Sequence, residues 1–230
     1  MSTVHLLPTA ALAERVLLPG DPGRALLLAQ SLLEQPKMFN HNRGLWGYTG
    51  EAHDGRPLTI QSTGMGGPSA AIVIAELADL GARTLLRVGT CGALDASLAL
   101  GELLVVTEAL AADGTSRALG AGDRVAPDPG LLARVLDAAG PGGARGPIVS
   151  SDLFYDGREG VEEEWRAQGA RAVDMETATL FALSTRRGLH AGCALIVSDT
   201  VLPSRRRIDT EALHDAERQL GELAVAALSG

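Results

Sequence analysis

Short runs of consecutive apolar residues alternate along the chain with longer segments in which apolar residues recur at helical spacing. An apolar run at residues 15–18 precedes a helical pattern over 24–33. A second run at 58–61 precedes a helical pattern over 69–80, for which Ser69 is a plausible N-terminal cap and Gly81 a stop. We predict further strands at residues 85–88, 102–108, 147–150, 172–175 and 194–198. We predict further helices at residues 131–139, 176–187 and 210–228.

The repeated order of strand, glycine turn and helix predicts an α/β fold. We expect a single domain over residues 1–230, built as a three-layer α/β/α sandwich with a mixed, largely parallel central sheet. No internal repeat or linker divides the sequence, and the least regular stretch, residues 111–129, is interpreted as an exposed excursion. Ligands of such folds bind at the carboxyl ends of the strands, where glycines and polar residues gather in this sequence.

The net charge, the length of the apolar runs and the number of cysteines limit the kinds of partner and ligand that we expect. The formal net charge is −8 and the pI is about 5.1, so we expect no general affinity for nucleic acid or anionic membranes. Neither a signal peptide nor a membrane span is predicted. The two cysteines, Cys91 and Cys193, are too few for a disulfide framework or a zinc cluster and suit a reducing cytoplasm. An anionic ligand requires cations that converge locally.

Two glycine-containing turns are candidates for binding an anion. Gly20 follows an apolar strand and precedes Arg24 at the start of a helix, where free N–H groups and the helix dipole favour negative charge. Arg87 lies near the end of another apolar strand, with Thr90 between glycines just after it. The alternatives are a tight turn with a surface arginine in the first case and an internal salt bridge in the second. Arg43 is a further candidate cation, although by itself it suits the surface.

Two carboxylates are candidates for contacts with a sugar and for proton transfer. Glu176 follows a predicted strand and could accept hydrogen bonds from neighbouring sugar hydroxyls; the alternative is a carboxylate placed by the helix dipole. Asp199 follows the strand at 194–198 and could act as a general acid if desolvation raises its pKa. The alternative for Asp199 is a cap of a turn or a short helix.

Seven motifs, taken in order, resemble those of the hexameric bacterial purine nucleoside phosphorylases, members of the nucleoside phosphorylase and nucleosidase superfamily. The resemblance extends from His5 to about Asp199. The motifs are GDPGRA near residue 20, NRGLWGYTG near 43, GMGGPSA near 65, RVGTCGA near 87, SSDLFYDG near 152, VDMETA near 174 and VSDT near 198. Each motif is weakly specific, and their order and spacing together are strongly specific.

The resemblance implies phosphorolysis of purine nucleosides, with Asp199 protonating purine N7. It implies a homohexamer arranged as a trimer of dimers, in which His5 and Arg43 reach the site of the neighbouring subunit. Inorganic phosphate is then a co-substrate, and no metal or organic cofactor is expected. The implied phosphate-binding residues are Gly20, Arg24, Arg43, Arg87 and Thr90. The implied ribose-binding residues are His5, Met65, Asp174, Met175 and Glu176. The implied base-binding residues are Cys91, Gly92, Phe154, Val173 and Asp199.

The sequence departs from the family pattern at two places. Asp174 stands where the family usually has a glutamate, so we expect a longer or water-mediated contact with ribose. The family also has an arginine that assists the catalytic aspartate. Arg218 matches its local motif, but the segment before it is several residues longer, and Arg205, Arg206 and Arg207 compete for the role.

Three rival functions remain. A uridine phosphorylase would carry a glutamine and an arginine just after the Phe154-Tyr155 pair, and residues 156–160, with the sequence DGREG, lack that pair. A 5′-methylthioadenosine phosphorylase or nucleosidase is the second rival, although a hydrolytic enzyme would not need Arg24, Arg43 and Arg87 together. The third is a non-catalytic nucleoside-binding protein on the same fold. Asp199 can interact with a 6-amino or a 6-oxo group, so we expect broad acceptance of purines.

Overall fold

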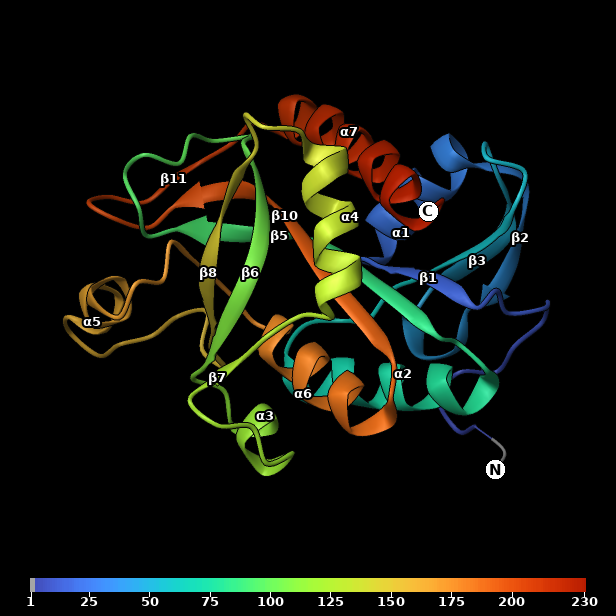
Figure 1. Cartoon of the computed structure of the whole chain (residues 1–230), viewed down its shortest axis with the longest axis horizontal. Coiled ribbons are helices and arrows are strands. Elements are labelled where there is room, and N and C mark those ends of the chain that lie inside the picture. The colour runs from blue at the N-terminus through green and yellow to red at the C-terminus, as the bar shows by residue number, and fades with distance from the viewer. Residues whose placement is uncertain (1–2) are drawn as a thin grey trace.

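The computed structural model describes residues 3–230, and within that range eleven strands form one mixed sheet (Figure 1). The strand order is β11-β10-β6-β8-β9-β5-β1-β4-β3-β2, with β7 paired to β6 and an additional pairing of β10 with β5. The strands are β1 (Arg15–Leu18), β2 (Leu33–Asn40), β3 (Gly47–Ala52), β4 (Pro57–Gln61), β5 (Thr84–Ala93), β6 (Leu103–Ala111), β7 (Arg124–Val125), β8 (Ala144–Ser150), β9 (Ala172–Asp174), β10 (His190–Thr200) and β11 (Arg206–Arg207).

Parallel pairing brings the carboxyl ends of four strands to one edge. β1 runs parallel to β4 and β5, and β5 runs parallel to β10. Beyond β5 the sheet curls until β5, β10, β6, β8 and β9 close into a ring, because β9 pairs with both β8 and β5. The loops after β1, β4, β5 and β10 therefore meet at one place beside this ring.

Helices cover both faces of the sheet, which confirms the predicted α/β/α layering (Figure 1). α1, α4 and α7 pack on one face, whereas α2 and α6 pack on the other, with α3 beside them. The helices are α1 (Pro22–Leu32), α2 (Gly67–Leu80), α3 (Gly114–Ala118), α4 (Pro129–Ala139), α5 (Val161–Ala167), α6 (Thr177–Arg187) and α7 (Thr210–Leu228), with a 3₁₀ turn η1 (Asn42–Gly44).

The alternation of side chains along β5 decides where its single arginine points. Leu86 and Val88 belong to the core beneath α1, α4 and α7, whereas Leu85 belongs to the core beneath α2 and α6. Successive side chains of a strand point to opposite faces, so Arg87 shares the face of Leu85 and lies toward α6. An arginine on an apolar strand is thereby placed inside the molecule, with 4% of its surface exposed.

Several local predictions need correction. β2 and β3 were not predicted, because five consecutive exposed residues interrupt the apolar pattern of β2. Helix α5 was also missed. Residues 111–129 are not simply an exposed excursion, since they hold α3 and β7 and the fully buried Asp113.

The start of α2 also differs from the prediction. Its N-terminal cap is Gly66, while the Ser69 hydroxyl donates to the carbonyl of Thr63. Gly81 ends the helix in the left-handed conformation, as predicted. Among residues 3–230, no helix has the length and apolar character needed to cross a membrane.

Candidate active site

A cavity of about 350 Å³ opens at the edge where the parallel strands end. It lies beside the turns after β1 and β4, the last residues of β5, the junction of β9 with α6 and the end of β10. This position agrees with the general location of ligand sites in α/β sheets. The predicted site residues that line the cavity are Gly20, Arg24, Met65, Arg87, Thr90, Cys91, Gly92, Phe154, Val173, Asp174, Met175, Glu176 and Asp199.

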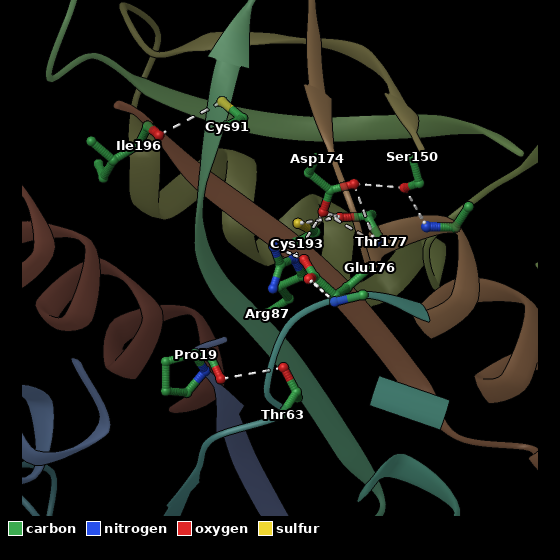
Figure 2. A network of polar contacts seen from close by, with 12 residues as sticks. Pro19, Thr63, Arg87, Cys91, Ser150, Asp174, Glu176, Thr177, Cys193 and Ile196 are labelled. Carbon is green, nitrogen blue, oxygen red and sulfur yellow. Dashed lines mark hydrogen bonds and ion pairs between the residues drawn. The ribbon is translucent and has the colours of Figure 1, made fainter. Parts of the chain in front are cut away.

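Arg87 is held at the inner end of this cavity by two buried carboxylates (Figure 2). Its Nε donates to Asp174 Oδ2 at 3.0 Å, and its Nη2 lies 2.6 Å from Glu176 Oε2. Burial lowers the pKa of Arg87, but attraction to Glu176 and Asp174 outweighs this effect and holds the pKa above its ordinary value. The guanidinium is therefore a fixed positive charge with a defined orientation.

One nitrogen of that guanidinium remains available. Arg87 Nη1 is buried and has no hydrogen-bond partner within residues 3–230. It faces Gly20, since a side chain built on this glycine would reach within 3.9 Å of Nη1. A buried N–H group without a partner costs about 1–3 kcal/mol, so this nitrogen favours a ligand that accepts hydrogen bonds. The internal salt bridge that was predicted as an alternative is therefore present, but it binds only Nε and Nη2 of the guanidinium and leaves Nη1 for a ligand.

A second guanidinium comes from the first turn of α1. Asp21 caps this helix by accepting from the Arg24 backbone N–H at 2.7 Å. The Arg24 side chain donates through Nε to Glu217 Oε1 at 2.6 Å, and both side chains are largely buried. Glu217 belongs to α7 and was not predicted as a site residue. Its carboxylate fixes Arg24 at the cavity wall while the two terminal nitrogens of Arg24 stay outside this contact.

Asp174 accepts hydrogen bonds from several side chains of the protein, which we did not predict from the sequence. Besides Arg87, it accepts from the hydroxyls of Ser150 and Thr177 and from the Thr177 backbone N–H (Figure 2). These contacts occupy both carboxylate oxygens. Asp174 therefore acts as the support of Arg87, and its predicted longer or water-mediated contact with ribose stays a prediction.

Glu176 stands closer to the cavity at the start of α6. It accepts from the Gly66 backbone N–H at 2.6 Å, which ties the β4–α2 turn to α6. Burial raises the pKa of the Glu176 carboxyl, and Arg87 opposes the rise. Met65 is 85% exposed on the same turn and forms part of the cavity rim. Carboxylate oxygens that each carry one protein contact retain lone pairs for sugar hydroxyls.

Asp199 lies at the opposite end of the cavity, inside β10 rather than after it. Only 6% of its surface is exposed, and its Oδ2 accepts from the Ser198 hydroxyl at 2.8 Å. Its Oδ1 has no hydrogen bond within the described part of the chain, although Arg207 Nε lies 3.2 Å away. Asp199 is therefore more than a cap of a turn, because one oxygen is free to face a ligand.

The structure does not bring Arg218 to Asp199. Arg218 lies on the exposed side of α7, where its Nη1 is 2.8 Å from Asp215 Oδ1. Arg207 occupies the predicted place instead, because antiparallel pairing of β10 with β11 sets it directly opposite Asp199. The longer segment before α7 thus forms a hairpin that places Arg207 beside Asp199.

The walls around Asp199 include the predicted base-binding residues. Gly92 pairs with Asp199 in the β5–β10 register and with Val173 in the β5–β9 register. A side chain on Gly92 would come within 2.6 Å of Val201, so only glycine permits this packing. Phe154, in the loop after β8, is about half exposed and lies beneath the guanidinium of Arg205.

Besides Arg218, two predicted residues lie outside the cavity. His5 is bound to Glu76 of α2, with 2.7 Å between Nδ1 and Oε1. Arg43 is exposed in η1 and adopts a left-handed backbone conformation, with a φ of 57°. Neither residue lines the cavity of its own chain, and their contribution to a neighbouring subunit stays a prediction.

The architecture is that of a known group of enzymes. The uridine phosphorylase of Vibrio fischeri superposes with a TM-score of 0.84 at 28% sequence identity, over 94% of this chain and 91% of that structure. This similarity confirms the predicted nucleoside phosphorylase-like fold.

Sequence comparison leads to the family itself. The model of the phosphorylase superfamily matches residues 14–229, so the chain belongs to this superfamily. A purine nucleoside phosphorylase of Jannaschia sp. is 39% identical over 94% of this chain and 93% of its own length. A guanosine phosphorylase of Halorubrum lacusprofundi is 37% identical over 84% of this chain and 81% of its own length. The predicted resemblance is confirmed, and the chain is an enzyme of nucleoside phosphorolysis.

Proposed function

We propose that this enzyme cleaves purine ribonucleosides and deoxyribonucleosides with inorganic phosphate, releasing the free base and ribose or deoxyribose 1-phosphate. The relatives named for purine or guanosine phosphorolysis support the choice of a purine. The observation that carries the proposal is the buried Arg87, whose free Nη1 points at the Gly20 turn while its other nitrogens are bound to carboxylates.

Phosphate binds at this inner end. The N-terminus of α1, the free nitrogen of Arg87 and the terminal nitrogens of Arg24 offer donors to its oxygens, with Thr90 on β5 beside them. A bound phosphate oxygen then attacks C1′ of the nucleoside as the bond from C1′ to the purine nitrogen breaks. The phosphate also stabilises positive charge that develops on the sugar.

The charge balance of the inner end supports an additional cation. Arg24 and Arg87 supply two positive charges, whereas Asp174, Glu176 and Glu217 carry three carboxyl groups. A phosphate dianion therefore lacks sufficient positive charge from one chain alone. The exposed Arg43 meets this need when a neighbouring subunit supplies it, and His5 reaches the ribose in the same way. The proposed assembly is a homohexamer built from such dimers.

The remaining residues act on the sugar and the base. Glu176 accepts from the 2′- and 3′-hydroxyls, and Met65 and Met175 line the sugar position. The electron pair of the broken bond passes to the purine, and Asp199 donates a proton from Oδ1 to N7. Arg207, 3.2 Å from that oxygen, stabilises the carboxylate that remains. Solvent returns the proton to Asp199. No metal or organic cofactor takes part in the proposed reaction.

Release of free base from inosine, adenosine and uridine, with and without inorganic phosphate, tests the proposal. We expect purine release only with phosphate and a loss of about 100-fold or more in kcat for Asp199→Asn. Release without phosphate would indicate a nucleosidase. Preferred turnover of uridine would favour the activity named for the Vibrio fischeri structure. A protein that binds purine nucleosides without turnover would contradict the enzymatic proposal.

A further inference from the structure

The hairpin between β10 and β11 carries three consecutive arginines to the base end of the cavity. Its turn is anchored by Thr200, whose hydroxyl donates to the Ser204 carbonyl at 2.8 Å and accepts from the Arg206 backbone N–H at 3.1 Å. Thr200 pairs with Arg206, and Asp199 pairs with Arg207. The position of each arginine relative to Asp199 is therefore set by strand pairing.

The three arginine side chains have different surroundings. Arg205 lines the cavity, whereas Arg206 and Arg207 are not part of the cavity wall. Arg207 contacts Asp199, with 3.2 Å between Nε and Oδ1. The proposed proton transfer uses Arg207 but gives no role to Arg205.

Arg205 is oriented by an aromatic ring. Its Cζ lies 4.8 Å from the centroid of the Phe154 ring, within the range of a cation–π contact. Phe154 and Arg205 both line the cavity. Because the family resemblance assigns Phe154 to the base, we place the Arg205 guanidinium at the edge of a bound purine. Glu162, in the first turn of α5, also lines the cavity and supplies a carboxylate.

The hydrogen-bonding groups of purines differ at this edge. Hypoxanthine and guanine present an accepting oxygen at position 6 and a donating N1–H, whereas adenine presents a donating amino group and an accepting N1. A guanidinium only donates, and a carboxylate only accepts. The pair of Arg205 and Glu162 therefore complements a 6-oxopurine, while adenine would set donor against donor and acceptor against acceptor.

We propose that Arg205, with Glu162 as the accepting partner, makes this site selective for nucleosides of 6-oxopurines over adenosine. The inference rests on the purine phosphorolysis proposed above and narrows its substrate class. It also replaces the broad acceptance expected from Asp199 alone, because Asp199 is compatible with both kinds of purine and Arg205 is not.

The test is the ratio of kcat/KM for inosine to that for adenosine at saturating phosphate. We expect the unaltered enzyme to favour inosine by at least about tenfold, the value of one well-placed hydrogen bond. Arg205→Ala should remove most of this preference by lowering kcat/KM for inosine and raising kcat/KM for adenosine, because the donor that opposes the adenine amino group is lost. Arg206→Ala is the matched control, with the same charge lost from the same hairpin, and should leave the ratio unaltered.

Equal use of adenosine by the unaltered enzyme would overturn the inference, as would an unchanged ratio in Arg205→Ala. An equal change in both arginine variants would show a general charge effect and would also overturn it. If no nucleoside is phosphorolysed, the proposed function fails instead. Calorimetric binding of hypoxanthine and adenine then tests Arg205 by itself, and equal affinities in the unaltered protein would contradict the inference.

Discussion

The two ends of the cavity are built in different ways. At the inner end, where we propose that phosphate binds, Arg87 has a side chain only 5% exposed and is held by carboxylates from β9 and the start of α6. At the base end, the Arg207 side chain is 73% exposed, and Arg205 and Phe154 come from a hairpin and a loop. The inner end is an ion-pair network in the core, whereas the outer end surrounds the buried Asp199 with exposed side chains from a hairpin and a loop.

This difference separates the reaction from the choice of substrate. A buried ion pair cannot be altered at one partner without leaving an unpaired charge in the interior. Exposed side chains on a hairpin are replaced at little cost to stability. We therefore expect substitutions at the phosphate end to affect folding and phosphate use, and substitutions at the base end to change mainly which base is accepted.

The largest expected effect concerns stability at the phosphate end. Arg87→Met leaves Asp174 and Glu176 buried without their cation and should lower the free energy of unfolding by about 3–5 kcal/mol. Arg205→Met, at the base end, should change it by no more than about 0.5 kcal/mol. Urea unfolding followed by circular dichroism measures both values. Similar losses in the two variants would remove the distinction between the ends.

A second substitution tests the support of Arg24. Glu217→Ala removes the acceptor of Arg24 Nε and should raise KM for phosphate about tenfold, with little change in KM for inosine. Glu217→Gln retains an acceptor oxygen and should recover part of the loss. Glu211→Gln, on the exposed first turn of the same helix, is the control. A rise in KM for inosine instead would place Glu217 outside the phosphate end.

A smaller effect is expected for Arg207, the arginine proposed to assist Asp199. Arg207→Ala should lower kcat by no more than about tenfold, because the carboxylate loses a charged neighbour 3.2 Å away. The loss is limited because the Arg207 side chain is exposed to solvent. Arg218→Ala should lower it less, since Arg218 pairs with Asp215 on the surface. Steady-state kinetics with inosine compares the two variants, and a greater loss in Arg218→Ala would reverse the assignment.

The smallest effect lies far from both ends, where Arg15 at the start of β1 binds Asp54 through paired contacts of 2.6 Å. Hydrogen bonds from Arg15 hold the pKa of the Asp54 carboxyl well below its ordinary value. The stabilisation is present above the unfolded pKa of about 3.9 and is lost as pH falls through the lower folded pKa.

Asp54→Asn should therefore reduce stability at neutral pH and weaken its dependence on pH below about pH 4. Thermal unfolding across pH measures this, with kcat as a reference that should not change. A variant as acid-sensitive as the unaltered protein would contradict the assignment of the low pKa to Asp54.

Much of the fold could be predicted because its strands and helices follow simple periodicities. The run at residues 85–88 became β5, and the helical pattern at 210–228 is α7. β2 could not be predicted, since Pro36 and a run of exposed polar residues hide its pairing with β3. Such strands are specified by their partners rather than by their own sequence.

The site residues, like the strands, could be predicted only where the local sequence specifies them. Arg87 and Gly20 could be identified because glycine turns after apolar strands have a recognisable local chemistry. Glu217 could not, because it meets Arg24 only through the packing of α7 on α1. Gly221 permits that packing, since a side chain there would come within 2.7 Å of Leu28. Likewise Arg207 reaches Asp199 through a hairpin whose register the sequence alone leaves undetermined.

The most direct test of the separation is a crossed kinetic measurement on Arg24→Gln and Arg205→Gln. KM for phosphate and the inosine-to-adenosine ratio of kcat/KM are determined for each variant. We expect Arg24→Gln to raise KM for phosphate by about tenfold without changing the ratio, and Arg205→Gln to lower the ratio without changing KM for phosphate. A change in both KM for phosphate and the ratio in either variant would contradict the separation of the two ends.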